Sequence, residues 1–353
     1  MAINRPERRQ ATTPDERTES SSGPALKDFD VHAMANKRFF VTGGAGFLGS
    51  NLVNTILDRD LGTVTVFDNF LTGRRQHFGS RVGSPALSIV EGDASDLRAL
   101  TDAIRGHDAV VHLAANSDIA KAASEPLIDF DNGTCLTQTL LEAMRTTGVK
   151  RILFTSGSGV YGEVPPKPIP EDYAPLIPIS TYGASKLASE TLLSAYCHMF
   201  DMVGTVFRFA NVVGPHMTHG VSHDFTRRLH ADPSRLRILG DGMQSKPYIH
   251  SDDVVAAILF ALQKQTSGYE YYNVGSEDHL LVRDIADIVT GEMGLKNVKY
   301  EYTGGTRGWR ADVPVYRLDT SKIRALGWRN KLNSREAVIE AVRSLLKEIA
   351  AGL

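Results

Sequence analysis

The sequence predicts a doubly wound parallel α/β sheet with a smaller, mixed α/β lobe toward its C-terminal end. The chain has 353 residues, which is too long for one minimal domain and suits a large α/β domain with an appendage. From Lys37 onward, apolar β-branched runs alternate with helix-period segments, as in a parallel sheet covered by helices on both faces. After Gly214 and Pro215 the elements become shorter, which indicates a second, smaller unit.

Six apolar runs predict the strands of the sheet, and a helical or loop segment follows each of them. Strand after strand ends on a small or polar residue, and open α/β sheets bind their ligands at these carboxyl ends. The runs are RFFVTG, TVTVFD, LSIVEGD, AVVHLAA, RILFTS and VGTVFRFA. Beyond Pro215 the pattern predicts helices near 221–231, 252–264 and 282–293, interleaved with the last part of the sheet.

The first 35 residues are rich in Arg, Glu, Ser, Thr and Pro and contain almost no large apolar side chains. Because such a segment cannot bury enough surface to offset the entropy of ordering, we expect a disordered tail over 1–35. We place the sheet domain at 36–212, with parts of the later chain returning to it, and the smaller lobe mainly at 213–353.

The composition argues against several classes of protein. The chain carries 39 basic and 41 acidic residues and a formal net charge of -2, so no overall field draws it toward nucleic acid or a membrane. It contains no apolar run of the roughly 18 residues that a membrane span needs, and no apolar core of an export signal. Cys135 and Cys197 lie in predicted helices without CxxC spacing. We therefore expect a cytoplasmic protein that binds small molecules and its own copies.

Histidines at positions 216, 219, 223 and 230 raise the question of a metal site. Pro215 and Gly220 interrupt the segment, and no carboxylate completes a ligand set. We therefore predict no metal and assign these histidines to a substrate loop.

The segment VTGGAGFLGS places Gly43, Gly46 and Gly49 between a predicted strand and a predicted helix. Glycine at such positions allows a tight turn, approach of a pyrophosphate to the backbone, and close packing of helix on strand. Asp68 ends the second predicted strand about 20 residues later, where a carboxylate binds the adenosine ribose and repels a 2'-phosphate. The pattern therefore predicts a Rossmann-type domain that binds NAD rather than NADP.

Further cofactor contacts are predicted at the ends of the third and fourth strands. GDASD offers Asp93 to the adenine amino group, and HLAAN places small residues beside the cofactor. The cofactor-binding residues predicted in this part of the chain are Gly43, Gly46, Phe47, Leu48, Gly49, Asp68, Asn69, Asp93, Ala94, Leu113, Ala114 and Ala115.

Tyr182 and Lys186 are four residues apart and so lie on one face of a predicted helix. A tyrosine with an ordinary pKa of about 10 is a poor base at neutral pH. A lysine ammonium one turn away stabilises the phenolate, so we expect it to lower the pKa of Tyr182 and make it a usable proton acceptor. With a dinucleotide-binding fold upstream, the pair predicts an active site.

These motifs resemble the extended short-chain dehydrogenase/reductase superfamily, in particular its NAD-dependent nucleotide-sugar epimerases and dehydratases, such as the UDP-glucose and UDP-glucuronate 4-epimerases. The resemblance covers Lys37 to about Trp328. It rests on TGGAGFLGS, FDN, GDASD, HLAAN, VYGE, YGASK, RFANVVGP, GDGMQSKPYIHSDD and RGWRADVP, in this order. It implies a soluble enzyme that holds NAD tightly, oxidises a sugar at C4, and returns the hydride after the 4-keto intermediate has rearranged.

The resemblance also implies roles for single residues. Tyr182 takes the O4 proton as hydride leaves C4, while Lys186 holds the phenolate and the nicotinamide ribose, so both contact the cofactor. Phe209 lies along the nicotinamide. Many relatives pair through a helix bundle, which here would pack 128–147 and 182–199 against a second copy in a homodimer.

The stretch TSGSGVYG departs from the family at its centre. Relatives have a Ser or Thr four residues before the tyrosine of VYG, where it hydrogen-bonds O4, and that position is Gly157 here. Ser158 is our first candidate to replace it and Ser156 the second. The alternative is a water in this space, at a cost of roughly tenfold to a hundredfold in rate.

The same stretch favours an epimerase. A 4,6-dehydratase resembling the family would show Thr-Asp-Glu before VYG, and a decarboxylase acting on nucleotide-linked glucuronate would show Thr-Ser-Glu. Ser158 and Gly159 occupy the last two places, so no second acid or base lies beside the sugar. We therefore expect a 4-epimerase of UDP-glucose/galactose or UDP-glucuronate/galacturonate. A UDP-glucuronate decarboxylase, an NDP-sugar 4,6-dehydratase and a catalytically impaired binding protein stay open as alternatives.

The resemblance places the nucleotide diphosphate of the substrate in the smaller lobe. Asn211 of RFANVVGP contacts the diphosphate, and Lys246 of SKPYIH stands where many relatives have an arginine. Arg307 and Asp312 of RGWRADVP resemble the pair that binds the phosphate and the nucleotide ribose, and a guanidinium suits phosphate geometry. Because this chain has one additional residue between those two, Arg310 is an alternative to Arg307.

Overall fold

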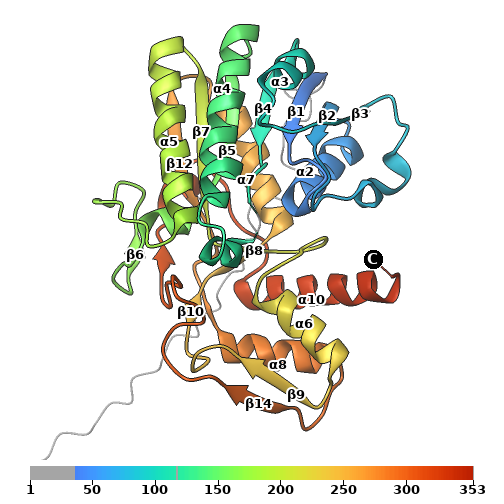
Figure 1. The fold of residues 1–353 in the computed structure, drawn as a ribbon, viewed down its shortest axis with the longest axis vertical. Coiled ribbons are helices and arrows are strands. Elements are labelled where there is room, and N and C mark those ends of the chain that lie inside the picture. The colour runs from blue at the N-terminus through green and yellow to red at the C-terminus, as the bar shows by residue number, and fades with distance from the viewer. Residues whose placement is uncertain (1–35, 117, 353) are drawn as a thin grey trace, which may run out of the picture.

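Seven parallel strands form the central sheet of the described residues (Figure 1). They are β1 (Lys37–Thr42), β2 (Gly62–Asp68), β3 (Leu87–Glu91), β4 (Ala109–His112), β5 (Arg151–Gly157), β7 (Val203–Phe209) and β12 (Tyr269–Val274). Their order is β12-β7-β5-β4-β1-β2-β3. The computed structural model describes residues 36–116 and 118–352, so the tail predicted over 1–35 lies outside the described residues. The predicted fold class is confirmed.

The order in which strands are added to the sheet reverses at β1. β2 pairs with one side of β1 and β4 pairs with its other side, so the later strands continue away from the earlier ones. In an open α/β sheet, the carboxyl ends of strands at such a reversal leave a crevice that binds ligands. The loops that follow β1 and β4 are therefore where this topology favours a cofactor.

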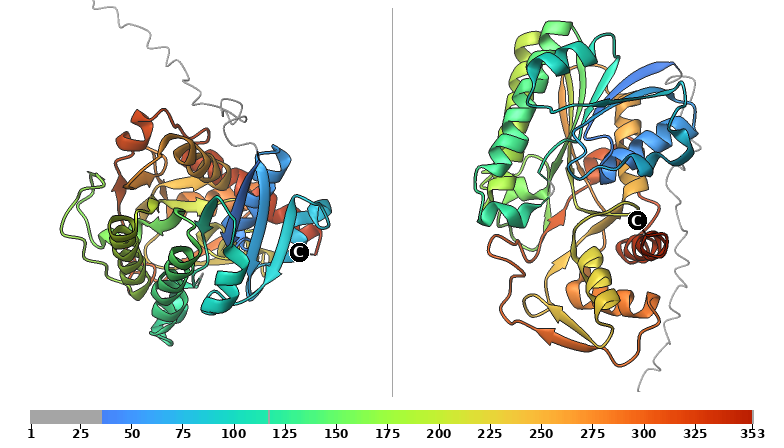
Figure 2. Two further views of the ribbon diagram at one scale, coloured as in Figure 1. Left: turned by 90° about the horizontal axis from the view of Figure 1, so that it is seen from above. Right: turned by 45° about the vertical axis from the view of Figure 1, so that its right-hand side comes forward.

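Helices cover both faces of the sheet, as the right-hand view of Figure 2 shows. They are α2 (Phe47–Asp58), α3 (Leu97–Ile104), α4 (Leu136–Thr147), α5 (Thr181–Phe200) and α7 (Ser251–Lys264). α2 and α7 share one buried apolar core, whereas α3, α4 and α5 pack over a second core on the opposite face. Within the described part of the chain, no helix combines the length and the apolar character that crossing a membrane requires.

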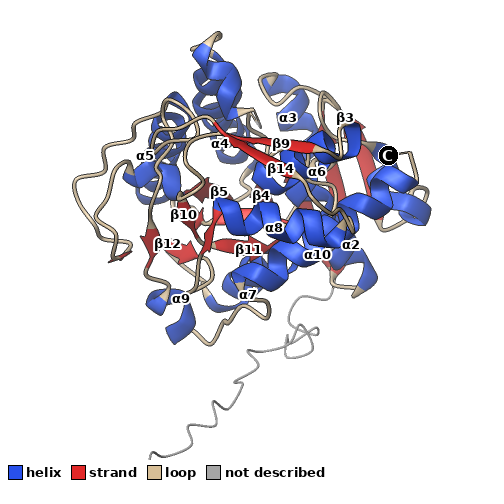
Figure 3. Ribbon diagram, turned by 90° about the horizontal axis from the view of Figure 1, so that it is seen from below, coloured by secondary structure: helices blue, strands red, loops and turns tan. Residues whose placement is uncertain are grey.

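The later part of the chain forms a smaller lobe at one end of the sheet (Figures 1 and 3). It contains α6 (Val221–Ala231), α8 (Val282–Glu292), α10 (Ser334–Ala350), and the parallel pair β9 (Arg235–Ile238) and β14 (Lys299–Tyr302). Asn333 and Glu336 form a capping box that starts α10. The short elements are β6 (Pro168–Ile169), β8 (Asn211–Val213), β10 (Ser245–Lys246), β11 (Tyr248–His250), β13 (Leu280–Leu281), β15 (Arg317–Leu318), α9 (Ser321–Ala325), and the 3-10 turns η2 (Arg75–Arg81), η3 (Ile119–Ala123) and η5 (Ser158–Tyr161).

The segment 128–147, which we predicted as part of a helix bundle, is not one regular helix. Its first part is a π-helical turn, η4 (Phe130–Cys135), and α4 follows it. The backbone N–H of Thr134 donates to Ser185 Oγ of α5 (3.0 Å), so this donor is used outside its own helix. Gly133 permits the approach, because a Cβ there would overlap the same oxygen. Turns of this kind are frequent at functional sites.

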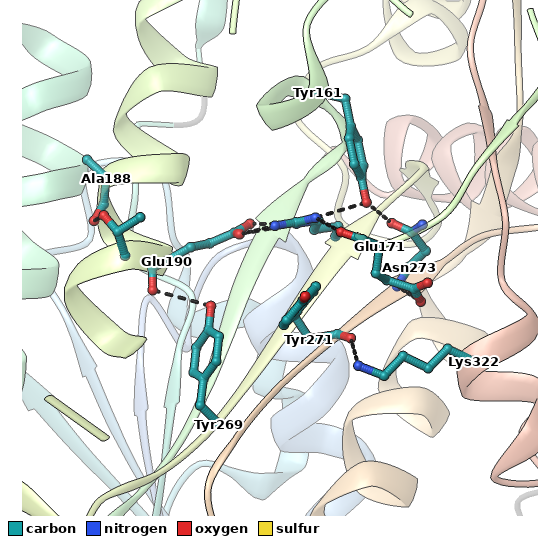
Figure 4. A network of polar contacts seen from close by, with 10 residues as sticks. Tyr161, Glu171, Ala188, Glu190, Tyr269, Tyr271, Asn273 and Lys322 are labelled. Carbon is teal, nitrogen blue, oxygen red and sulfur yellow. Dashed lines mark hydrogen bonds and ion pairs between the residues drawn. The ribbon is translucent and has the colours of Figure 1, made fainter. Parts of the chain in front are cut away.

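A buried ion pair joins α5 to β7, and Figure 4 shows the network around it. Arg208 Nη2 lies 2.7 Å from Glu190 Oε2, and neither side chain is more than 5% exposed. Arg208 Nη1 also donates to the Tyr161 hydroxyl (3.0 Å) and to the Glu171 carbonyl (2.9 Å). Burial lowers the pKa of Arg208, but its hydrogen bonds and charge interaction with Glu190 outweigh burial, and the pKa is raised overall. Both charges are therefore kept in the interior.

His112 is buried at the end of β4 between two hydroxyl groups. Its Nδ1 lies 2.7 Å from Thr42 Oγ1, and its Nε2 lies 3.1 Å from Thr137 Oγ1. Burial, together with the charge of Lys186, lowers the pKa of His112 to about 3. The imidazole is therefore neutral at physiological pH.

Protonation of His112 should destabilise the fold as the pH falls from 6.5 toward 3. The unfolded chain binds this proton with the higher pKa, so acid favours the unfolded state. We expect the free energy of unfolding to fall by about 2 kcal/mol between pH 6.5 and 5 from this group alone. Urea unfolding at several pH values measures the slope. His112→Gln should flatten it, whereas His198→Gln at an exposed position should not; equal slopes in wild type and His112→Gln would contradict this account.

Candidate active site

The loop between β1 and α2 depends on its glycines. Gly43 has φ +68°, and a Cβ there would lie 2.7 Å from Ala114 N. A Cβ on Gly49 would collide with the Gly43 carbonyl oxygen. Within the described residues, α2 has no side-chain hydrogen bond at its N-cap Gly46, which leaves its first N–H groups open to a negatively charged ligand. The first-turn residues are Phe47 and Leu48, both half-buried.

Carboxylates stand at the ends of β2 and β3. Asp68 Oδ2 accepts a hydrogen bond from Ala45 N (2.9 Å) and Oδ1 accepts one from Phe70 N (2.8 Å), which fixes the group and leaves lone pairs for ribose hydroxyls. Hydrogen bonds from Ser95 hold the pKa of Asp93 below its ordinary value. Asn69 follows Asp68 in the sequence, and Ala94 follows Asp93. The residues Leu113, Ala114 and Ala115 come directly after β4, where the strand order reverses.

Tyr182 and Lys186 lie on α5 beside the end of β5. Lys186 Nζ donates to the Thr155 carbonyl oxygen (2.8 Å) and lies 5.6 Å from the centroid of the Tyr182 ring. Burial lowers the pKa of Lys186 to about 8, while Glu190 and Asp129 oppose that change. The structure therefore brings the predicted catalytic pair together with its ammonium group held by the sheet.

The pKa of Tyr182 differs from our expectation. Burial, and next the negative charge of Asp129, raise the pKa of Tyr182 to about 12. The prediction that Lys186 lowers this pKa is wrong for this structure, because burial disfavours the phenolate and the ammonium alike. A proton acceptor at this position needs a further positive charge beside the phenol.

Gly157 ends β5 at a place where a side chain would fit. Its φ of -162° is extended backbone that any residue adopts, and a Cβ would have Phe209 O as its nearest neighbour at 4.0 Å. Ser156 Oγ is buried and has no hydrogen-bond partner among the described residues. Ser158 lies near Tyr316, whose hydroxyl is buried without a hydrogen-bond partner among the described residues, and burial raises the pKa of Tyr316 to about 12. Ser156 and Ser158 adjoin the open position along the chain, and the role of either hydroxyl at O4 stays a prediction.

Three predicted substrate-binding residues meet in one cluster of the smaller lobe. Lys246 forms an ion pair with the buried carboxylate of Asp312. Arg307 donates to the Asp312 carbonyl oxygen (2.6 Å) and forms an ion pair with Glu163. Lys246 and Arg307 are therefore each paired with a carboxylate. The carboxylate of Glu163 is largely exposed, whereas that of Asp312 is buried.

The remaining predicted residues lie around this cluster and the sheet. Phe209 is buried at the end of β7, opposite Gly157 in the strand register. Asn211 lies on β8, and its side-chain amide donates to the Pro247 carbonyl oxygen (3.3 Å). Arg310 is exposed.

Comparison with known proteins assigns the chain to a family. The profile of the NAD dependent epimerase/dehydratase family matches residues 39–275, which is more than half of the chain. The chain belongs to this family. It is 32% identical to the UDP-glucose 4-epimerase of Mycolicibacterium smegmatis over 313 residues, which cover 86% of this chain and 97% of that protein.

Solved structures of epimerases and dehydratases both resemble this member of the family. A crystal structure of UDP-glucose 4-epimerase with UDP-glucose from Thermotoga maritima has a TM-score of 0.79 and 30% identity, and covers 88% of this chain and 99% of that one. A dTDP-glucose 4,6-dehydratase double mutant from Streptomyces venezuelae with NAD bound has a TM-score of 0.81 and 29% identity, and covers 89% and 98%.

The residues present fit the cofactor of the NAD-dependent epimerase/dehydratase family. The uncapped start of α2 offers N–H groups to a pyrophosphate, and Asp68 is fixed where it can accept from ribose hydroxyls. Gly43 and Ala114 bring the loops after β1 and β4 together at the reversal of the sheet. NAD is the cofactor.

Two polar residues beside this site were not predicted from the sequence. Asp129 lies close enough to affect the pKa of Tyr182, and Tyr316 lies beside Ser158. The sequence contained a signal that could have identified Tyr316 as a site residue, because it follows the RGWRADVP motif by two positions. Asp129 had none, because it sits in a stretch that we predicted as helix.

The histidines at the start of the smaller lobe make other contacts in this epimerase/dehydratase. His216 stacks on His77, with ring centroids 4.1 Å apart. Across residues 36–116 and 118–352, no group of three or more His, Cys, Asp or Glu side chains could hold a metal ion. Cys135 and Cys197 are both free thiols.

Proposed function

We propose that the protein is a 4-epimerase of a UDP-sugar, either UDP-glucose/galactose or UDP-glucuronate/galacturonate. The observation that carries this proposal is the Tyr182 and Lys186 pair beside a strand end where Ser158 and Gly159 provide no acid. Elimination of water or loss of carbon dioxide needs a further acid or base beside the sugar, whereas inversion at C4 needs one proton acceptor. The relatives named UDP-glucose 4-epimerase support the same choice.

The residues of α5 would perform the proton transfer. NAD, when bound, supplies the hydride acceptor, and its oxidised nicotinamide ring carries a positive charge. Tyr182 takes the proton from O4 of the sugar and returns it to O4 of the inverted product. Lys186, held by the Thr155 carbonyl, stabilises the phenolate and binds the nicotinamide ribose. Ser158 or Ser156 hydrogen-bonds O4 across the space at Gly157.

The cationic cluster of the smaller lobe would bind the diphosphate, together with Asn211. The ion pair of Arg307 and Glu163 is 37% and 58% exposed, so it contributes little stability. A diphosphate can replace Glu163 at the guanidinium, where the planar fork forms two charge-assisted hydrogen bonds. Lys246 then adds charge, and Asp312 is left for the nucleotide ribose.

We also propose that two copies pair through α4 and α5 and that the enzyme is cytoplasmic. Phe130 and Met199, at the edge of this bundle, are 53% and 70% exposed, as expected of side chains that a second copy covers. Light scattering on the purified protein tests the pairing, and a monomeric mass at micromolar concentration argues against it.

Product analysis by NMR tests the function. The purified protein, without added NAD, is incubated with UDP-glucose and separately with UDP-glucuronate. Appearance of the C4 epimer of either sugar supports the proposal and identifies the substituent at C5. Release of carbon dioxide or water points to a decarboxylase or dehydratase, and no change in either sugar points to another nucleotide or to a binding protein.

Gly157→Ser should fold normally and raise kcat by about tenfold. The backbone is extended and a Cβ meets nothing closer than 4.0 Å, so the substitution introduces no strain. A hydroxyl at this position stands where relatives have theirs, so it should contact O4 more directly than Ser158 or Ser156, which lie one residue away; a well-placed polar contact of this kind is worth roughly tenfold to a hundredfold. Initial rates on the converted sugar measure the effect, with Gly157→Ala as the control for added volume. A rate that falls equally in both variants would mean that the space is used by the substrate.

A further inference from the structure

The chain before η4 places a buried carboxylate against the first turn of α5. Asp129 is 2% exposed, and its Oδ2 accepts a hydrogen bond from the Thr181 hydroxyl (2.7 Å). Its main-chain carbonyl accepts a second one from Ser185 Oγ (2.6 Å). Thr181 and Ser185 stand before and after Tyr182 in the helix, so Asp129 holds the turn that carries the proposed proton acceptor.

The same carboxylate also holds the loop that follows β4. Asp129 Oδ1 accepts a hydrogen bond from Asn116 Nδ2 (2.8 Å), and the backbone N–H of Asn116 donates to the Asn132 carbonyl oxygen (3.0 Å). This loop contains Ala114, which approaches Gly43 of the cofactor loop. Asp129 therefore connects the cofactor side of the site to α5, and both of its oxygens are used in doing so.

We propose that Asp129 is a positioning residue for proton transfer at Tyr182: its buried carboxylate joins the first turn of α5 to the loop that follows β4 and places a negative charge next to the turn that carries the phenol. This inference rests on the proposed function of Tyr182. The hydrogen bonds supply the positioning, because each one links Asp129 to a residue adjacent to the acceptor or to the loop opposite it.

The charges around the phenol explain the electrostatic part. Asp129 and Lys186 face Tyr182, and Lys186 in turn faces Glu190 and the neutral His112. The charge of Asp129 adds to burial in raising the pKa of Tyr182 and opposes the decrease at Lys186. The phenol thus keeps its proton with Lys186 alone beside it, and proton acceptance would depend on the further positive charge of a bound, oxidised cofactor.

The pH profile of kcat/KM tests the proposal in the NAD-loaded enzyme. Asp129→Asn and Asp129→Ser both remove the charge, and each should move the ascending limb to lower pH by about one unit. Thr181→Val is the matched control, because it removes a hydrogen bond to Asp129 and keeps the charge. It should lower kcat without moving the limb. A purely structural role for Asp129 predicts lower kcat in all three variants with the limb in its wild-type place, and that result overturns the proposal.

A titration of the phenol gives a second readout that needs no turnover. Protein labelled with ¹³C at tyrosine Cζ is titrated with NAD bound, and Tyr182→Phe identifies the resonance. Ionisation should begin at lower pH in whichever neutral variant folds, and an unchanged onset overturns the proposal. Because this signal is read without a sugar, failure of the proposed function leaves it intact and is seen separately in the wild-type assay.

Discussion

Replacement of Tyr182 by phenylalanine should lower kcat for the interconverted sugar about a thousandfold while NAD stays bound. The change removes only the phenolic oxygen, which is the group that takes the O4 proton in the proposed mechanism. Lys186 keeps its hydrogen bond to the Thr155 carbonyl, so the ammonium stays where it is. The proposed NAD contacts of β1, β2 and α2 do not involve the phenol. Initial rates, with bound NAD measured after denaturation of the protein, check both parts of the expectation.

Tyr196→Phe is the control for this experiment. It makes the same chemical change on the same helix, where the hydroxyl accepts a hydrogen bond from Gln138 Nε2 (2.6 Å) outside the site. We expect its kcat to stay within about twofold of wild type, because the hydroxyl of this half-buried side chain contacts α4 rather than the Tyr182 site. Should Tyr182→Phe retain a tenth or more of the wild-type rate, another group takes the proton and the mechanism fails.

The parts of the fold that follow from local pattern were predictable. The six apolar runs form β1 to β5 and β7, because strands inside a sheet that is covered on both faces leave a nearly continuous apolar signal. The edge strand β3 keeps part of this signal in Leu87, Ile89 and Val90. The glycine loop was also predictable from a short stretch of sequence, because Gly43 and Gly49 lie where the backbone of another residue comes too close for a side chain. The spacing of Tyr182 and Lys186 on one helix face, with the glycine loop upstream, extended the prediction to this pair.

What the sequence did not show depends on contacts between distant segments. Asp129 accepts a hydrogen bond from Thr181, which is 52 positions away in the sequence, and no short motif indicates that contact. The π-turn at η4 arises because Thr134 donates to Ser185 of another helix, which periodicity along one segment cannot reveal. The pKa of Tyr182 went against expectation because burial of the whole site outweighs one neighbouring ammonium. Charge balance in a buried site therefore needs the three-dimensional neighbours.

The largest effect on stability should come from breaking the buried pair of Glu190 and Arg208. Glu190→Gln leaves the guanidinium charge without a carboxylate in the interior, and we expect a loss of about 3–5 kcal/mol in the free energy of unfolding. The hydrogen bonds of Arg208 to the Tyr161 hydroxyl and the Glu171 carbonyl do not replace the missing charge. Urea unfolding at pH 7 measures the loss. The exposed pair of Glu340 and Arg343 on α10 provides the control, since Glu340→Gln should leave the unfolding midpoint nearly unchanged.

A double variant separates the cost of an unpaired charge from the worth of the pair. Glu190→Leu with Arg208→Met removes both charges, so it should be less destabilised than Glu190→Gln alone. If the double variant is the least stable of the set, packing around the network matters more than charge.

Glu190 also lies one helical turn beyond Lys186, whose pKa it raises against burial. Glu190→Gln should therefore lower the pKa of Lys186 further and reduce turnover in the protein that stays folded, because less of the lysine is charged to hold the phenolate.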